Sequence, residues 1–208
     1  MKIRRIESSK HKQERVLVHT EEGDLLRVTQ AELLQFGLYP GLELSDGQAE
    51  ELRSAARRSE TKLKAARVAS GRMVSKKELA DRLRRGGAAP EEAEEAAARM
   101  EELGVVNDAA YAGAVARHYA AMGYGRRRVE QELFRRGVPR ELWEKALEEL
   151  PSGAEAAEAF LRGKLRGRTP DGAELKRLSD ALLRRGFSRE EIRPALQRVS
   201  GPETDLDE

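Results

Sequence analysis

Clusters of arginine and lysine are the residues in this sequence that could do chemistry. Arginine carries a planar fork of N–H donors that binds phosphate and carboxylate groups through paired hydrogen bonds. The clusters stand near the ends of segments with helical apolar spacing. The candidate contact residues for a partner protein or for DNA are Arg84 and Arg85, Arg126, Arg127 and Arg128, Arg135 and Arg136, Arg162, Lys164 and Arg166, and Arg184 and Arg185.

The three arginines at 126–128 differ from the other clusters because they begin a predicted helix. Cations near a helix C-terminus, such as Arg84, Arg85, Arg184 and Arg185, are favoured by the helix dipole by about 0.3–1 kcal/mol, so ordinary solvated surface also explains them. Cations at a helix N-terminus oppose the dipole and indicate another purpose. Exposed backbone N–H groups there also favour an anion, so we expect helix and arginines to converge on one acidic group of a partner.

Residue groupings typical of enzymes are absent from the sequence. There is no Gly-x-x-x-x-Gly-Lys-Ser/Thr phosphate loop, and Gly123-Tyr124-Gly125 lacks the third glycine of a dinucleotide fingerprint. The paired acids between Glu91 and Glu95 fall in the first turns of a predicted helix, where the dipole favours them. Three histidines stand apart from one another, and packing or solvent contact explains them better than a metal site: His11, His19 and His118. We expect no catalytic residue, no cofactor and no metal.

Composition favours a charged helical chain with thin cores. Charged residues make up 37% of the sequence and aromatic residues 4%, against about 25% charged residues in an average soluble protein. Net charge is only +2, so nucleic-acid binding would depend on local clusters. No cysteine is present, no apolar run is long enough to span a bilayer, and the first six residues lack the apolar stretch of a secretory signal. We therefore expect a cytoplasmic protein without a membrane segment.

The first segment reads as a small α+β cap. Two short apolar runs, in 14–19 and 24–28, flank Glu21-Glu22-Gly23, which predicts a hairpin with Gly23 at positive φ. Thr29 can cap a short helix that ends at Gly37. Ser45 or Asp46 can then cap a long charged helix that runs to about residue 70.

Helix signals are strong from Ser75 onward. Capping boxes begin at Ser75, Ser152 and Ser188, and Thr169-Pro170 predicts a further helix start. Pro194 falls inside the last predicted helix, which it should kink or effectively begin. Five glycines stand where helices should stop: Gly87, Gly104, Gly123, Gly137 and Gly186.

These signals recur with a period near 50 residues. Gly87, Gly137 and Gly186 follow one another at intervals of 50 and 49 residues. Apolar residues four and eight positions before each glycine form a helical stripe that we expect to be buried: Leu79 and Leu83, Val129 and Leu133, Leu178 and Leu182. Such a period indicates stacked helical repeats, because a single unit cannot bury its own apolar face.

The sequence therefore predicts a mainly α fold in six segments. The first two repeats should contain three helices each and the last repeat two. The expected segments are a cap at 1–44, a charged linking helix at 45–74, repeats at 75–122, 123–168 and 169–200, and a disordered acidic tail at 201–208.

Several of these motifs carry a resemblance to a known family. Leu103-Gly104-Val105-Val106-Asn107-Asp108, Tyr111-Ala112, Gly123, Arg136-Gly137-Val138 and Leu183-Arg184-Arg185-Gly186-Phe187-Ser188 resemble, in order and spacing, the signature of the RecX family of RecA regulators. The similarity covers nearly the whole chain. Asn107-Asp108 stands where the family usually has two acids, and Trp143 stands where it usually has an aliphatic residue.

The resemblance implies an elongated, curved array of three-helix units that lies in the groove of the RecA–DNA filament. It implies inhibition of the filament's ATPase, strand-exchange and co-protease activities, with RecA as partner and DNA reached through the filament or its backbone phosphates. We expect a monomer. Two other interpretations stay open: a helical-repeat module that binds DNA backbone without the recombinase, and a purely structural scaffold.

Overall fold

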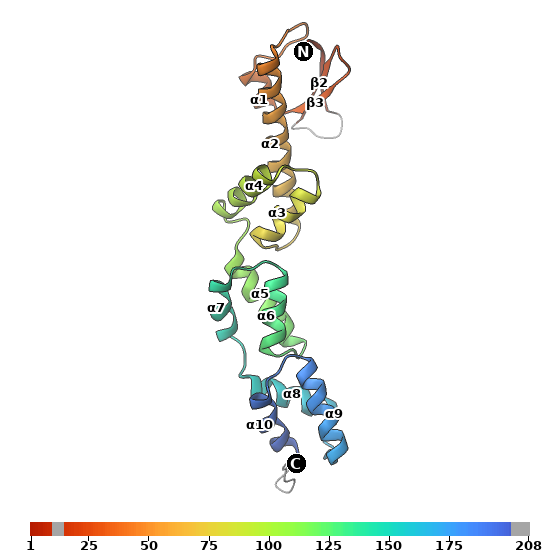
Figure 1. Ribbon diagram of the computed structural model, residues 1–208, viewed down its shortest axis with the longest axis vertical. Helices are drawn as coiled ribbons and strands as arrows, with labels where there is room; N and C mark the ends of the chain where they lie inside the picture. Colours follow the sequence, from red (N-terminus) through yellow and green to blue (C-terminus); the bar gives the residue numbers. More distant parts are fainter. Residues whose placement is uncertain (10–14, 201–208) are drawn as a thin grey trace. The chain divides into compact units, whose positions relative to one another are not determined.

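The computed structural model describes residues 1–9 and 15–200 of the 208-residue chain. His11 and the acidic tail at 201–208 lie outside the described residues. The described part is mostly helical with one small antiparallel sheet, which confirms the mainly α fold (Figure 1). It divides into two compact units, one made of residues from 1–73 and 79–106 and the other of residues from 74–78 and 107–200. In residues 1–9 and 15–200, none of the helices has the length and apolarity that crossing a membrane requires.

The N-terminal sheet has three antiparallel strands in the order β1-β2-β3. The expected hairpin is present as β2 (Val16–Thr20) and β3 (Leu25–Val28), and Gly23 in its turn has a φ of +96°. The third strand, β1 (Ile3–Ser8), was not predicted. Its sequence is rich in charge, and it joins the sheet through backbone hydrogen bonds that side-chain patterns do not report.

Two capped helices follow the sheet in the first unit. Thr29 and Ser45 form complete capping boxes at the starts of α1 (Gln30–Gln35) and α2 (Asp46–Gly71), as expected. The first half of α2 closes the core of the sheet, because buried residues of strands, loops and helix form one cluster. This cluster consists of Ile3, Val16, Val18, Val28, Leu38, Leu44, Ala49, Leu52 and Ala56.

The second half of α2 packs against α4 (Pro90–Glu102), and α3 (Lys76–Arg85) lies between them in the chain. Lys62 on α2 lies 2.9 Å from Glu95 on α4. Small buried side chains let these helices approach closely, among them Ala65, Ala93, Ala96 and Ala97.

The second unit contains two three-helix cores. The first core is made by α5 (Asp108–Ala121), α6 (Arg126–Arg135) and α7 (Trp143–Glu148), with a 3₁₀ turn at Arg140–Leu142. Its buried residues include Tyr111, Val115, Val129, Leu133, Val138 and Leu147.

The second core is made by α8 (Gly153–Leu165), α9 (Gly172–Arg184) and α10 (Arg189–Ser200). Its buried residues include Leu161, Leu175, Leu182, Phe187, Ile192 and Leu196. Figure 1 shows α8, α9 and α10 gathered together in the cyan-to-blue part of the chain. Pro194 lies inside α10 rather than at its start.

Two expectations about α9 are wrong. Thr169 does not cap this helix, because α9 begins at Gly172 and the Asp171 side chain accepts the Glu174 N–H at 2.6 Å. Of the six stripe residues, Leu178 is only half-buried, and Leu175 is the buried leucine one turn earlier. α9 has 13 residues where α3 and α6 have 10, so its first three residues have no counterpart in the other repeats, and the buried Leu175 stands at the position of Lys76 in α3 and Arg126 in α6.

The cores of the second unit are out of phase with the sequence period. The period groups α5 with the helices before it, whereas α5 packs with the two helices that follow. In the same way α8 packs with α9 and α10. A repeat period gives the length of each repeat but not the residue at which each packed three-helix unit begins. The repeat boundaries expected from the sequence therefore stay predictions.

Candidate partner-binding surface

The helix α6 begins with three arginines, and two of them have carboxylate partners within the chain. Arg126 lies 2.9 Å from Glu130 and 2.7 Å from Glu144. Hydrogen bonds with Glu144 and then with Glu130 raise the pKa of Arg126. Arg128 lies 3.1 Å from Glu132. Both arginines therefore have an acid four residues later, which offsets their unfavourable place near the helix N-terminus.

Glu132 is a buried carboxylate surrounded by guanidinium groups. It lies 2.6 Å from Arg135, 3.1 Å from Arg128 and 3.7 Å from Arg136. Burial raises the pKa of Glu132, but hydrogen bonding with Arg135 and the charges of Arg135 and Arg128 together hold this pKa below its ordinary value. One carboxylate shared by three cations leaves this part of α6 positive. Glu132 is not among the residues predicted from the sequence, although its i,i+3 and i,i+4 spacing to arginine is a readable signal.

Arg136 makes its main contacts inside the chain. Its guanidinium donates to the Tyr111 hydroxyl at 2.8 Å and lies 5.9 Å from the centre of the Tyr119 ring. The Tyr111 hydroxyl in turn donates to Glu78 at 3.3 Å. Arg136 therefore connects the end of α6 to α5 and, through the Tyr111 hydroxyl, to Glu78. These contacts within the chain already engage its guanidinium group.

Arg185 also holds parts of the chain together. Its guanidinium donates to the carbonyl oxygens of Met122 at 2.9 Å and of Gly123 at 3.2 Å, just past the end of α5. The same group lies 4.5 Å from the ring centre of Phe160 and 5.0 Å from that of Tyr124. These contacts join the two cores of the second unit.

The end of α9 meets the start of α6 through backbone hydrogen bonds. The Gly125 N–H donates to the Arg185 carbonyl at 2.9 Å, and the Arg127 N–H donates to the Gly186 carbonyl at 3.2 Å. We call this contact the second joint. It satisfies N–H groups at the start of one helix with carbonyls at the end of another. The expectation that an external anion binds at this helix start is wrong for these two N–H groups, because the chain's own carbonyl oxygens occupy them.

An equivalent contact, the first joint, lies at the other end of α6. There the Ser75 hydroxyl donates to the Arg136 carbonyl and accepts the Glu78 N–H at 3.0 Å. Ser75 and Gly125 are 50 residues apart, and Arg136 and Arg185 are 49 residues apart, so the joints are repeat equivalents. Each joint places the negative end of one helix dipole against the positive end of another, which is favourable.

The basic pair in the first unit has local partners. Arg84 forms ion pairs with Asp81 and, at 3.6 Å, with Glu94. Arg85 donates to the Asp81 carbonyl at 3.2 Å. Both arginines lie at the C-terminal end of α3, which agrees with the interpretation of this pair as ordinary helix-end surface.

The basic run on α8 is mostly occupied as well. Arg162 lies 2.7 Å from Glu158, and the Lys164 ammonium lies 5.8 Å from the centre of the Phe160 ring. Among the twelve candidate cations, three are exposed and have no side-chain partner within the described part of the chain: Arg127, Arg166 and Arg184. Two of these, Arg127 and Arg184, lie beside the second joint.

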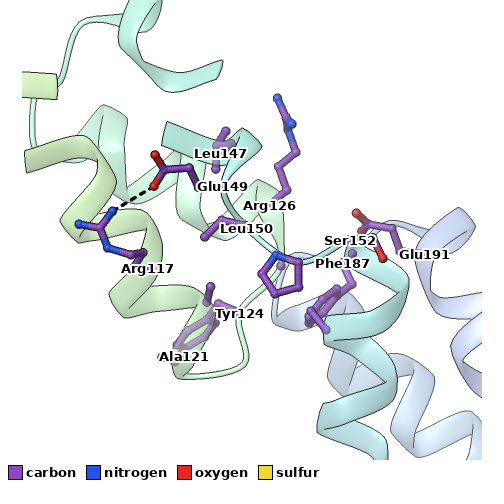
Figure 2. A pocket seen from close by; sticks show the side chains of 15 residues that line it. Arg117, Ala121, Tyr124, Arg126, Leu147, Glu149, Leu150, Ser152, Phe187 and Glu191 are labelled. Atoms are coloured by element: carbon purple, nitrogen blue, oxygen red, sulfur yellow. Dashed lines mark hydrogen bonds and ion pairs between the residues drawn. The ribbon is translucent and has the colours of Figure 1, made fainter. Parts of the chain in front are cut away.

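A pocket of about 490 Å³ opens between the two cores near the second joint (Figure 2). Arg117 and Glu149 form an ion pair of 3.2 Å at one edge, and Arg126 also lines the pocket. Its apolar lining includes Tyr124, Leu147, Leu150 and Phe187. Two polar side chains of the lining, Ser152 and Glu191, are used as helix caps. This lining is suited to binding an apolar group. It is poorly suited to proton transfer or nucleophilic attack, because Ser152 and Glu191 are already engaged as helix caps.

No group of three or more His, Cys, Asp or Glu side chains that could hold a metal ion occurs in residues 1–9 and 15–200. The fold and the surface thus define a helical-repeat protein whose basic helices meet end to end, with two of the three candidate arginines that are unpaired in the described chain, Arg127 and Arg184, beside the second joint.

Comparison with known proteins gives the family. Residues 107–147, which form the first core of the second unit, match a family model described as "RecX, second three-helix domain". The chain is 31% identical over 160 residues to "Regulatory protein RecX" of Caldanaerobacter subterraneus subsp. tengcongensis, covering 77% of this chain and 81% of the relative. It is also 31% identical over 188 residues to "Regulatory protein RecX" of Geobacillus kaustophilus, covering 87% of this chain and 70% of the relative.

Solved structures share the fold. A crystal structure of a regulatory protein RecX aligns with a TM-score of 0.69 and 21% identity over 92% of this chain and 97% of that chain. RecX from Lactobacillus salivarius aligns with a TM-score of 0.62 and 22% identity over 70% of this chain and 97% of that chain. The chain belongs to the RecX family of regulatory proteins, as its sequence motifs indicate.

Proposed function

We propose that this chain binds the RecA filament on single-stranded DNA and restrains its ATPase, strand-exchange and co-protease activities. It thereby regulates DNA repair and the SOS response in the cytoplasm, acting as a monomer and catalysing no reaction of its own. The observation that carries the proposal is membership of a family whose curated relatives are named as regulatory proteins, with the chain covering 81% of one of them.

The charge pattern supports contact with an anionic protein assembly. Most candidate cations are already engaged within the chain, so few remain for a long run of DNA phosphates. Arg84, Arg126, Arg128, Arg135, Arg136 and Arg162 each lie within ion-pair distance of a carboxylate. The unpaired Arg127 and Arg184 suit a small number of carboxylates or phosphates on a partner.

The testing experiment measures ATP hydrolysis by RecA on single-stranded DNA as this protein is added. The expected result is a saturable decrease in hydrolysis, with no hydrolysis by the protein alone. The combined variant Arg127→Ala/Arg184→Ala should require a higher concentration for the same inhibition. Unchanged hydrolysis at saturating concentration would refute the proposal, as would ATPase or nuclease activity in the purified protein.

DNA-backbone binding without the recombinase is the second candidate function, and the unpaired Arg127, Arg166 and Arg184 favour it. It predicts affinity for free single strands that falls by about 0.7 log units per log unit of salt for each phosphate contacted. Replacing these three arginines with alanine should flatten that slope. If the wild type binds free single strands weakly and its affinity hardly changes with salt, the result supports binding to the RecA filament instead.

A further inference from the structure

Two exposed apolar side chains occupy equivalent places in successive repeats. Phe134 on α6 is 67% exposed and Leu183 on α9 is 37% exposed. They are 49 residues apart, which is the same interval as that between Leu133 and Leu182. Phe134 directly follows the fully buried Leu133, and Leu183 directly follows the fully buried Leu182. Both side chains therefore point to solvent from the same position relative to the buried face of their helix. Neither side chain is among the apolar residues that pack against the two core clusters of the second unit, within the described part of the chain.

The second joint fixes how these two side chains are related. The end of α9 meets the start of α6, so the two helices run in the same direction one after the other. Leu183 lies two residues before Arg185 at the joint, and Phe134 lies nine residues after Gly125. At a rise of 1.5 Å per helical residue plus the joint itself, the two side chains are on the order of 20 Å apart.

Each apolar side chain is followed by an arginine. Arg184 follows Leu183 and has no side-chain partner in the described chain, and Arg135 follows Phe134 with a 66% exposed side chain that pairs with Glu132. An apolar contact beside a guanidinium fits a protein surface on which an apolar hollow is bordered by carboxylates. A leucine cannot stack on a nucleobase as an aromatic ring does, so the property shared by both repeats favours protein over nucleic acid.

We infer that Phe134 and Leu183 are two equivalent anchors that bind the same acidic-edged apolar hollow on neighbouring subunits of one protein filament. A chain that presents the same contact twice at a fixed spacing gains most from a partner that also repeats, because the second contact forms at high effective concentration. The inference rests on the proposed function, and it names the contact surface and the repeated nature of the partner. The first repeat carries Arg84 at the equivalent place, so this apolar anchor belongs to the second and third repeats.

The test measures the affinity of labelled full-length protein for the RecA filament on single-stranded DNA. Phe134→Ser and Leu183→Ser should each raise Kd about tenfold, as expected for loss of a buried apolar anchor, while Phe134→Leu should leave it within about threefold. Leu34→Ser is the matched control, since Leu34 is 79% exposed on α1, and its Kd should equal that of the wild type. The replaced side chains are exposed, so melting temperatures should stay near the wild-type value.

The outcomes separate the inference from the function on which it rests. If wild-type protein does not bind the filament, the proposed function fails. If the wild type binds and either serine variant binds equally well, the two-anchor inference fails and the function stands. A loss of free single-stranded DNA affinity in Phe134→Ser would overturn the inference in favour of base stacking. A wild-type dimer that becomes a monomer in the variants would overturn it in favour of self-association.

Discussion

Replacing Gly125 with alanine tests whether the second joint holds the two cores of the second unit together. The φ of Gly125 is −81°, which any residue adopts, so the backbone conformation itself does not require glycine. Space does: a Cβ at this position would lie 2.6 Å from the Gly186 carbonyl oxygen and 2.6 Å from the Phe187 nitrogen. Both are backbone atoms that no side-chain rotation can move, so the helix ends must separate.

The cost of Gly125→Ala follows from that separation. Overpacking costs about 1–3 kcal/mol, and weakening the two backbone hydrogen bonds of the joint adds about 0.5–1.5 kcal/mol for each. The lower entropy of the unfolded alanine chain offsets about 0.4–1 kcal/mol. We expect a loss of about 2–4 kcal/mol in the free energy of unfolding, measured by urea denaturation followed by circular dichroism at 222 nm.

Gly163→Ala is the matched control for this prediction. Gly163 lies inside α8, and a Cβ there would meet nothing within 4 Å. Alanine should therefore stabilise the protein by about 1 kcal/mol through its better helix propensity. If Gly125→Ala unfolds at the same urea concentration as the wild type or a higher one, the steric reasoning about the second joint is refuted.

Four further substitutions give distinct expected outcomes. Leu133→Ala removes a side chain with 0% exposure from the first core of the second unit, and urea denaturation should show a loss of about 2–5 kcal/mol; a loss below 1 kcal/mol would contradict that packing. Glu132→Gln should destabilise the protein by about 1–3 kcal/mol at pH 7. Because the pKa of Glu132 is lowered in the folded state, its contribution is present above the unfolded carboxyl pKa and is lost as pH falls through the folded value, so wild type and variant should converge in acid; an unchanged gap in acid would refute this linkage. Arg185→Ala should lower the free energy of unfolding by about 1–3 kcal/mol through loss of two carbonyl contacts, whereas the exposed Arg127→Ala should change it by less than about 0.5 kcal/mol; equal effects would contradict their assignment to different roles.

Local signals in the sequence predicted the helices well. Thr29, Ser45, Ser152 and Ser188 cap helices as expected, because a capping box acts within four residues of chain. The glycines that end helices have positive φ for a similarly local reason, since few other residues adopt that conformation without strain. The family was also readable, because its motifs depend on order and spacing along the chain.

The first residues of strands and helices were predicted less accurately where contacts with distant parts of the chain determine them. Strand β1 forms because the hairpin offers an edge for backbone pairing, and its own side chains carry little sign of this. In α9 the Asp171 carboxylate caps the helix instead of Thr169, the helix begins three residues earlier than its equivalents α3 and α6, and Leu175 is buried in the core. A fixed repeat period cannot report such a local extension.

The roles of the arginines were decided by the tertiary structure. The sequence determined which residues are charged and that they gather at helix ends. It could not determine that Arg136 and Arg185 turn inward at two equivalent joints, or that Arg127 and Arg184 stay unpaired beside one of them. The physical reason is that an arginine's partners are chosen by what lies within a few ångströms of its long side chain. For Arg185 those partners, the carbonyls of Met122 and Gly123, stand more than 60 residues away in the sequence and reach it only when the helices meet end to end.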